Sequence, residues 1–129
     1  MFASVVEELV GMSDDELLER IEANELERRR LDAEMSAALA VAKGRDLHGT
    51  TGHRTMAAFC RAQLNWSTTE SVRRLGLARA VDAVPGLGEA WSRGRFGQPQ
   101  AIKLSAVNAN PRVADQLPDY APQLLQHAE

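Results

Sequence analysis

The chain of 129 residues has a single cysteine, Cys60, and no long apolar run. One cysteine excludes a disulfide framework, and its place in the stretch MAAFCRAQL indicates a buried, unreactive thiol in a reducing compartment. The longest apolar run, AALAVA at residues 37–42, is far shorter than the ~20 residues of a membrane span. The N-terminus, MFASVVEELVG, lacks the basic region of a signal peptide. We therefore expect a cytoplasmic protein without a membrane partner.

Aromatic residues are also scarce, at 5% of the chain, and β-branched residues are few. No segment shows the alternation of apolar and polar residues that marks a half-buried strand. Helical spacing instead recurs between glycines and prolines. The sequence therefore predicts an all-α fold, and its length and 44% apolar content suit a single helical domain over residues 1–129.

Lysine is rare as well, since 13 of the 15 basic residues are arginine. The formal net charge of −3 hides a polarity along the chain, because residues 1–34 sum to −7, residues 43–112 to +7 and residues 113–129 to −3. The arginine bias fits either a phosphate-binding surface or the codon usage of a GC-rich genome. The basic segment at residues 43–112 either binds a polyanion or neutralises the acidic segment at residues 1–34.

The acidic part of the chain predicts two helices. A short one over residues 3–10 stops at Gly11. The run Ser13-Asp14-Asp15-Glu16 then has the capping-box pattern, in which the serine and the glutamate satisfy each other's backbone amides. We expect a long, acidic, amphipathic helix over residues 13–43, ended by Gly44.

This long helix carries a stripe with the alternating spacing of four and three residues that is typical of a coiled-coil seam. The stripe consists of Leu17, Ile21, Asn24, Arg28, Leu31, Met35, Ala38 and Ala42. Two packings are open: the stripe contacts the protein's own core, or it joins two copies in a homodimer. In the homodimer the polar members would fix the register at some cost in stability. The dimerisation candidates are Leu17, Ile21, Asn24, Arg28, Leu31 and Met35.

Residues 54–83 predict a helix-turn-helix-like pair. A helix over residues 55–63 is followed by a tight turn at residues 64–66 and by a helix that opens with a second capping-box pattern, Ser67-Thr68-Thr69-Glu70. So short a connection makes the two helices cross at a large angle. Compared with a repressor-type pattern, the apolar residue expected at Ser71 comes one place late, as Val72. The residues expected to face the core are Val72, Leu75, Ala78 and Val81.

In DNA-binding proteins the second helix of such a pair enters the major groove. Small hydroxyl side chains and arginines would then make the contacts to bases and phosphates. The DNA-binding candidates are Thr68, Thr69, Ser71, Arg73, Arg74, Arg79, Arg54 and Arg61, and Arg93, Arg95 and Lys103 would add to the positive face. Helix pairs of this kind are also common in all-α proteins that do not bind DNA.

The remaining segments are short. The polar loop at residues 44–53 has three glycines but lacks the ending and the preceding strand of a phosphate-binding loop. Short helices are expected over residues 87–117: one at residues 87–93 closed by Gly94 as a left-handed C-cap, one at residues 100–108 behind Pro99, and a further start at Pro111. Residues 118–129 look like a truncated tail. Trp66 and Trp91, both beside turns, are expected to be packing anchors.

The run GHRTMAAFCRAQLNWSTTESVRRLGLARAVDAVPGLGEAWSRGRFGQPQAIKLSAV resembles the helical N-terminal domain of the 13E12 repeat family. In these bacterial proteins a domain of unknown function precedes a C-terminal HNH endonuclease module. The shared features are the AAF helix start at residues 55–59, the helix end ARAVDAVP at residues 78–85 and GRFGQPQA at residues 94–101. The resemblance extends over roughly residues 17–110. It implies a context resembling mobile elements, which favours DNA as a partner.

The nuclease activity that the resemblance implies belongs to the HNH module, and this chain shows no such motif. His48, His53 and His127 are scattered, and no Cys-x-x-Cys pair accompanies them to hold a metal. We expect no catalytic residue, metal, cofactor or small-molecule ligand. The sequence thus predicts a non-catalytic domain that binds or targets DNA for an endonuclease. The alternative is a protein-interaction or homodimerisation module that uses the long helix.

Overall fold

The computed structural model describes residues 1–95 and 97–108, and within these ranges it contains helices and connecting turns but no strand. This confirms the all-α prediction. The elements follow in the order α1 (Phe2–Val10), α2 (Asp14–Gly44), α3 (Leu47–Thr50), α4 (Met56–Leu64), α5 (Thr68–Ala83), α6 (Leu87–Ser92) and α7 (Gln98–Asn108). No helix in these ranges is long and apolar enough to cross a membrane.

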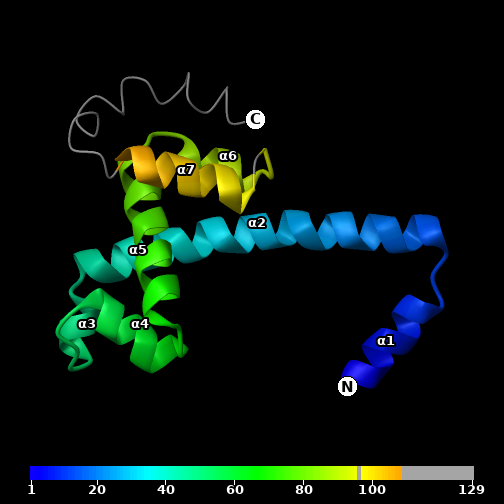
Figure 1. Cartoon of the computed structure of the whole chain (residues 1–129), viewed down its shortest axis with the longest axis horizontal. Coiled ribbons are helices and arrows are strands. Elements are labelled where there is room, and N and C mark those ends of the chain that lie inside the picture. Colours follow the sequence, from blue (N-terminus) through cyan, green and yellow to red (C-terminus); the bar gives the residue numbers. More distant parts are fainter. Residues whose placement is uncertain (96, 109–129) are drawn as a thin grey trace.

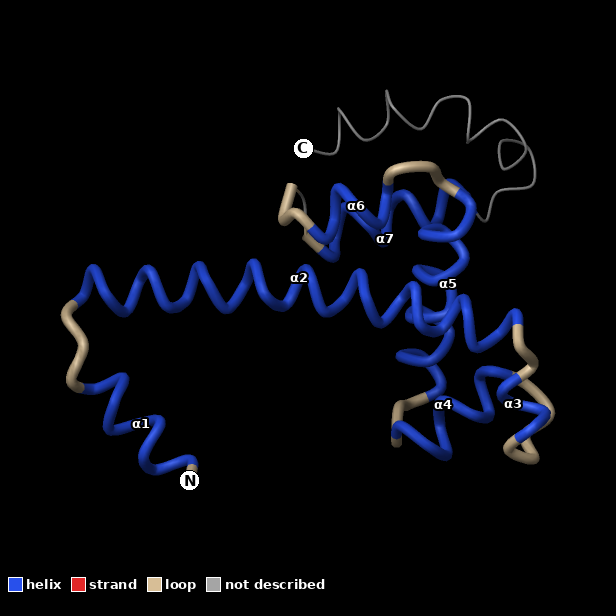
Figure 2. Tube along the Cα trace, turned by 180° about the vertical axis from the view of Figure 1, so that it is seen from behind, coloured by secondary structure: helices blue, strands red, loops and turns tan. Residues whose placement is uncertain are grey.

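Helix α2 is a long rod that is covered at only one end (Figures 1 and 2). The helices from α3 to α7 gather around its C-terminal half, while its N-terminal part projects and carries α1 at its tip. We call residues 1–24, which comprise α1 and the first turns of α2, the arm, and the rest of the described chain the body. At the rise of an α-helix, 31 residues extend about 46 Å, so the tip of the arm lies far from the body.

The helix starts follow the capping chemistry read from the sequence. At α2, the Ser13 hydroxyl accepts a bond from the Glu16 amide at 3.2 Å and the Glu16 carboxylate accepts one from the Ser13 amide at 3.4 Å, which completes the predicted capping box. At α5, the Ser67 hydroxyl accepts from the Glu70 amide at 3.0 Å. The Glu70 carboxylate, however, turns to two arginines, so only half of the second box forms.

Two boundaries differ from expectation, and a third agrees with it. Residues 44–53 are not all loop, because Asp46 adopts a left-handed conformation (φ 55°) and begins the single-turn helix α3. Helix α7 starts two residues earlier than expected, at Gln98. Gly94 has φ 77°, as predicted for the left-handed end of α6. Pro111 and the tail at residues 118–129 lie outside the described residues.

Helix α5 is the centre of the body, with α2, α4, α6 and α7 packed around it. It crosses α4 at a large angle, as predicted for the helix pair (Figure 1). One apolar cluster surrounds Trp91, whose side chain is completely buried between α2, α5, α6 and α7. A second cluster joins α2, α4 and α5 around Cys60, also completely buried. The predicted burial of Trp91 and Cys60 is thus confirmed.

Candidate functional site

The predicted stripe of α2 is not the face that packs on the body. The residues of α2 that are buried there are Asp32, Ala33, Ser36 and Leu39, none of which belongs to the stripe. Within the stripe, Ile21 is 59% exposed, Leu31 50% and Met35 37%. The stripe residues Asn24, Arg28 and Ala38 are exposed too, and Leu17 and Ala42 are half-buried. The stripe thus packs on the body only at Ala42, which contacts the cluster around Cys60, and the intramolecular packing considered for the stripe as a whole is wrong.

The small side chains of α2 explain this outcome. Ala33 and Ser36 let α5 and α6 approach the helix axis closely, and the Ser36 hydroxyl is satisfied locally by donating to the Asp32 carbonyl at 3.0 Å. Larger stripe residues at the interface would hold these helices further away. The buried face is consequently chosen by size and internal hydrogen bonding rather than by apolar character alone.

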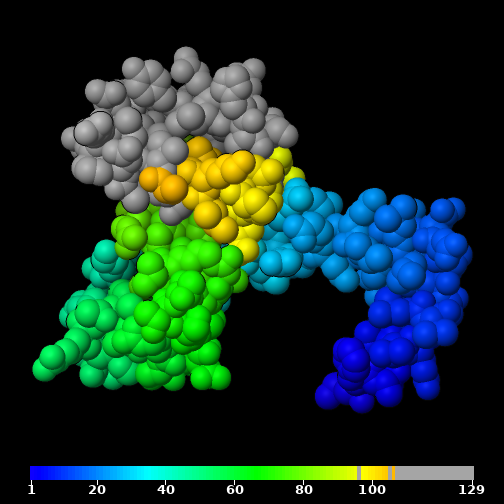
Figure 3. All heavy atoms as spheres, in the orientation of Figure 1, coloured from blue at the N-terminus to red at the C-terminus, as the bar shows by residue number. Residues whose placement is uncertain are grey.

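The arm exposes an unusual amount of apolar surface for its size. In α1, apolar residues follow the helical spacing of one face, yet Phe2 is 79% exposed, Val5 45% and Val6 42%. In the adjoining part of α2, Leu18 is 54% exposed. Figure 3 shows the arm standing clear of the body, with an open hollow beneath α2 between α1 and the body. No described part of this chain covers these apolar faces.

The arm is also strongly acidic, and most of its charges lack a partner. One ion pair, between Arg20 and Glu8 at 3.1 Å, ties α1 to α2. The other carboxylates of the arm make no ion pair within the described residues. They are Glu7, Asp14, Asp15, Glu16, Glu19 and Glu22.

The acids in the middle of α2 differ, because neighbouring arginines neutralise them. Arg29 pairs with Glu25 at 3.2 Å, and Arg30 pairs with Glu27 at 2.6 Å and with Glu34 at 3.0 Å. The hydrogen bond from Arg30 is the main reason that the pKa of Glu27 is lowered. The unpaired negative charge of α2 is therefore concentrated in the arm.

In the helix pair, Arg74 is a structural residue. Its guanidinium donates to Asp32 of α2 at 2.9 Å and to Glu70 at 2.7 Å, and it lies 5.6 Å from the centroid of the Trp66 ring. Trp66 is half-buried and packs against the second cluster, as expected of an anchor. Arg73 bonds to Glu70 and to the Gln98 side chain at 3.1 Å. These two DNA-binding candidates thus connect α5 to α2 and α7.

The electrostatics of Glu70 reflect this network. Its pKa is lowered, chiefly by the hydrogen bond from Arg74 and against the opposing effect of burial, with Arg73 contributing. For Arg74 itself, burial opposes the charged form, but the bonds to Glu70 and Asp32 prevail and raise its pKa. The charged forms of Glu70 and Arg74 therefore stabilise each other at neutral pH.

Ser71 and Val72 exchange the roles that we expected. Ser71 is completely buried and its hydroxyl donates to the Ser67 carbonyl at 2.8 Å, whereas Val72 is 57% exposed. The expectation that Val72 faces the core is wrong. A serine can take the core position because its hydroxyl is satisfied by the preceding turn of its own helix. As expected, Ala78 is buried, and Leu75 and Val81 are half-buried against the two clusters.

The other DNA-binding candidates remain at the surface. Thr68 and Thr69 are exposed in the first turn of α5, and Lys103 and Arg95 are exposed near α7. Arg93 is exposed and lies 4.0 Å from Glu89. None of this tests DNA binding, which stays a prediction.

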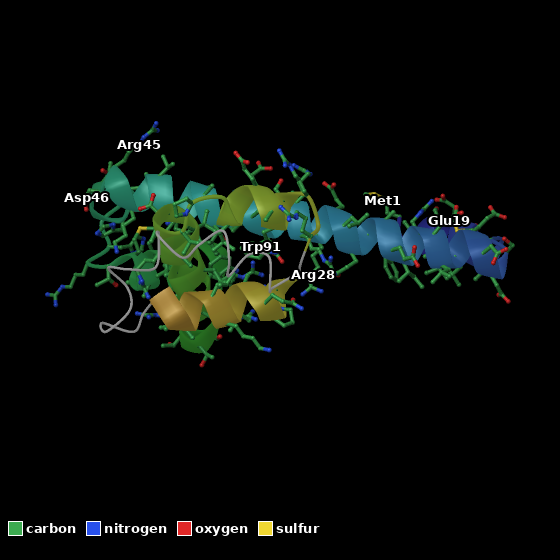
Figure 4. All side chains as sticks on the ribbon, turned by 90° about the horizontal axis from the view of Figure 1, so that it is seen from above. Met1, Glu19, Arg28, Arg45, Asp46 and Trp91 are labelled. Carbon is green, nitrogen blue, oxygen red and sulfur yellow. The ribbon has the colours of Figure 1, made fainter. Side chains whose placement is uncertain are left out.

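Unpaired cations lie at the C-terminal end of α2, opposite the arm, and on α4, α5 and the segment before α4. We call this group the basic end; each member is exposed and makes no ion pair within the described residues. Its members are Lys43, Arg45, Arg54, Arg61 and Arg79. Lys43 and Arg79 line a cavity of about 350 Å³ between α2, α4 and α5. Figure 4 shows Arg45 at one end of α2 and Glu19 toward the other.

Two of these residues, Lys43 and Arg45, were not among the DNA-binding candidates. Their signal in the sequence was their position at the C-terminus of the long helix, where the helix dipole favours cations. The structure brings Lys43 to the same cavity as Arg79, although Arg79 lies 36 positions further along the chain. It leaves Arg73 and Arg74 apart from this group.

The described residues offer little for metal or acid-base chemistry. No three His, Cys, Asp or Glu side chains gather in residues 1–95 and 97–108 in a way that could hold a metal ion. A histidine–carboxylate pair joins His48 Nε2 and Asp46 Oδ1 at 3.1 Å. The absence of an enzymatic role stays a prediction.

Comparison with known proteins gives one match. Neither the curated proteins nor the solved structures contain a match to this chain. A family model matches residues 18–120, so the match begins inside the arm and leaves α1 outside. The link to 13E12 proteins and to an HNH module stays a prediction. The matched region includes most of α2 and the whole described body, and the chain therefore belongs to the family described as "Domain of unknown function (DUF222)".

Proposed function

We propose that this domain is a non-catalytic homodimerisation module that binds a second copy of itself through α2. The observation that carries the proposal is the exposure of the stripe: Ile21, Leu31 and Met35 lie at seam spacing on a long helix, and the body leaves them uncovered. Contiguous apolar surface on a folded domain marks an interaction site. A second copy supplies the same stripe, which is what a two-fold symmetric interface requires.

Multi-angle light scattering over a range of protein concentrations tests this proposal. The wild type is expected to pass from monomer to dimer as concentration rises. Leu31→Asp, which places a charge in the seam, is expected to stay monomeric. Val72→Asp is the matched control, because Val72 is equally exposed but lies on α5 away from the seam, and it should still dimerise. A wild type that remains monomeric at every concentration would refute the proposal.

A second function is favoured by a separate observation, the basic end. Five exposed cations without ion pairs at one end of the domain are suited to binding phosphates and releasing their counterions. We propose DNA as the polyanion, consistent with the resemblance to proteins that carry an endonuclease module. The contacts would come from Arg54, Arg61 and Arg79, with Thr68 and Thr69 nearby in the chain, rather than from Arg73 and Arg74.

Fluorescence anisotropy with a generic duplex tests the second function. Binding at low salt should weaken steeply as salt rises, and the triple variant R54A/R61A/R79A should lose most of it. Replacing Arg28 by Ala is the control, because Arg28 is an exposed arginine of α2 outside the basic end. Absence of binding by the wild type at low salt would exclude DNA.

A further inference from the structure

We infer that the two copies in the dimer lie antiparallel, so that the acidic arm of each contacts the basic end of the other. This inference rests on the proposed dimerisation through α2. It adds an orientation and a second pair of contact surfaces, neither of which follows from the exposed stripe alone.

The distribution of unpaired charge supports this orientation. The arm has six carboxylates without an ion pair in the described residues, and the basic end has five such cations. The arm lies at one end of α2, whereas Lys43 and Arg45 lie at the other end (Figure 4), so the arm cannot reach these two cations within one molecule. A second copy is a partner certain to carry both groups at the same spacing. Charge complementarity of this kind selects the orientation of a pair.

The middle of α2 does not oppose this arrangement, because its charges are already matched. Glu25, Glu27 and Glu34 pair with arginines of the same helix, and Asp32 pairs with Arg74. What remains there for a partner is apolar surface, mainly Leu31 and Met35. When the two-fold axis crosses α2 at the level of residue 33, Leu31 of one copy lies beside Met35 of the other.

A parallel pair would be unfavourable at three places. The two acidic arms would lie side by side, as would the two basic ends, and each Arg28 of the stripe would face its own copy. Like charges that directly oppose one another are destabilising. A head-to-tail arrangement would form one contact of arm with basic end at each interface, against two in the antiparallel pair, and would continue into an open filament. In the antiparallel pair both arms contact a basic end, and the assembly is closed at two copies.

Distances between spin labels test the orientation. In a Cys60→Ala background, a label at Glu22→Cys should lie about 33 Å from its counterpart, because the copy's residue 22 lies beside residue 44 at 1.5 Å per residue. A label at Glu34→Cys, near the two-fold axis, should lie within about 20 Å of its counterpart. Short distances at both positions would reveal a parallel dimer and overturn the inference alone. Absence of any coupling would indicate a monomer and overturn the proposed function as well.

A charge-reversal exchange provides a test that keeps Cys60. The arm variant E19K/E22K and the basic-end variant R45E/R54E change exposed, unpaired residues. Each alone should dimerise more weakly than the wild type by on the order of tenfold. Mixed together, they should form a heterodimer of about wild-type affinity, because every reversed arm then meets a reversed basic end. Unchanged homodimers, or a mixture without recovery, would overturn the inference.

Discussion

The arm and the body use the same kinds of residue in opposite ways. In the body, Arg74 points inward: it joins Asp32, Glu70 and Trp66, and its guanidinium is mostly buried. In the arm, apolar and acidic side chains alike point into solvent, and one ion pair fastens α1. The body is therefore stabilised by its own contacts, whereas the arm has little tertiary packing to keep it folded.

This difference indicates that the body uses its surfaces for folding, whereas the surfaces of the arm are left for another role. A helix of nine residues such as α1 is marginal in water without packing. Its apolar face thus makes sense as a surface that a partner covers. The following predictions sharpen the contrast between arm and body.

The largest effect is expected in the body, from Trp91→Ala. The completely buried indole fills the centre of the first cluster, and removing such a side chain costs about 3–5 kcal/mol in the free energy of unfolding. Phe2→Ala in the arm is the counterpart and should cost less than about 0.5 kcal/mol in the monomer. Urea unfolding of both variants at a concentration where the protein is monomeric measures the difference. Similar losses would show that the arm is part of the folded core.

Arg74→Ala should destabilise the body by about 3 kcal/mol, because it leaves Asp32 without a cation and Glu70 with Arg73 alone in a largely buried site. Arg79→Ala removes an exposed arginine of the same helix and should change the free energy of unfolding by less than about 0.5 kcal/mol. Thermal unfolding separates the two. If Arg74→Ala were as stable as Arg79→Ala, the network would not hold α5 against α2.

Acid should weaken the body through Glu70. The pKa of this carboxyl is lower in the folded protein than its ordinary value of about 4.3. Its contribution is therefore present at neutral pH and disappears as the pH falls through the folded pKa. The variant Glu70→Gln should lose part of the stability at pH 7 and show a shallower fall toward acid. An unchanged pH slope would contradict the assigned role of the Arg74 hydrogen bond.

The smallest effect is expected at the start of α2. Ser13→Ala removes the N-cap and should cost about 1 kcal/mol of local helix stability. Because the arm makes few contacts with the body, this loss should appear as faster amide exchange in the first turns of α2 and leave the global unfolding midpoint nearly unchanged. A clear fall in the midpoint would mean that arm and body unfold as one unit.

The sequence predicted the helices well but not the faces that they bury. Local signals such as the Ser13 capping box and the Gly94 turn depend on neighbouring residues alone, and they are found as expected. The buried face of α2 depends instead on which helices approach it. Ala33 and Ser36 lie on that face, but they are less apolar than the stripe residues, so the sequence did not indicate that they would be buried. The single turn of α3 depends on Asp46 adopting a left-handed conformation that its sequence does not require.

The candidate sites, too, could be predicted from the sequence only in part. Spacing identified the exposed stripe and the arginines of α5. It could not show that Arg74 reaches Asp32, which lies 42 positions earlier in the chain. Nor could it show that Lys43 lies beside Arg79 across a cavity. Both relations arise from tertiary packing, which a reading of one segment at a time does not contain.

The central claim is that the arm is a surface covered by a second copy, and concentration-dependent amide hydrogen exchange tests it most directly. At low protein concentration, residues 14–24 should exchange fast compared with α5, because these turns lack tertiary cover. At concentrations where the dimer forms, their protection should rise markedly while that of α5 stays constant. Fast exchange of the arm at every concentration, in a sample that light scattering shows to be dimeric, would contradict the claim.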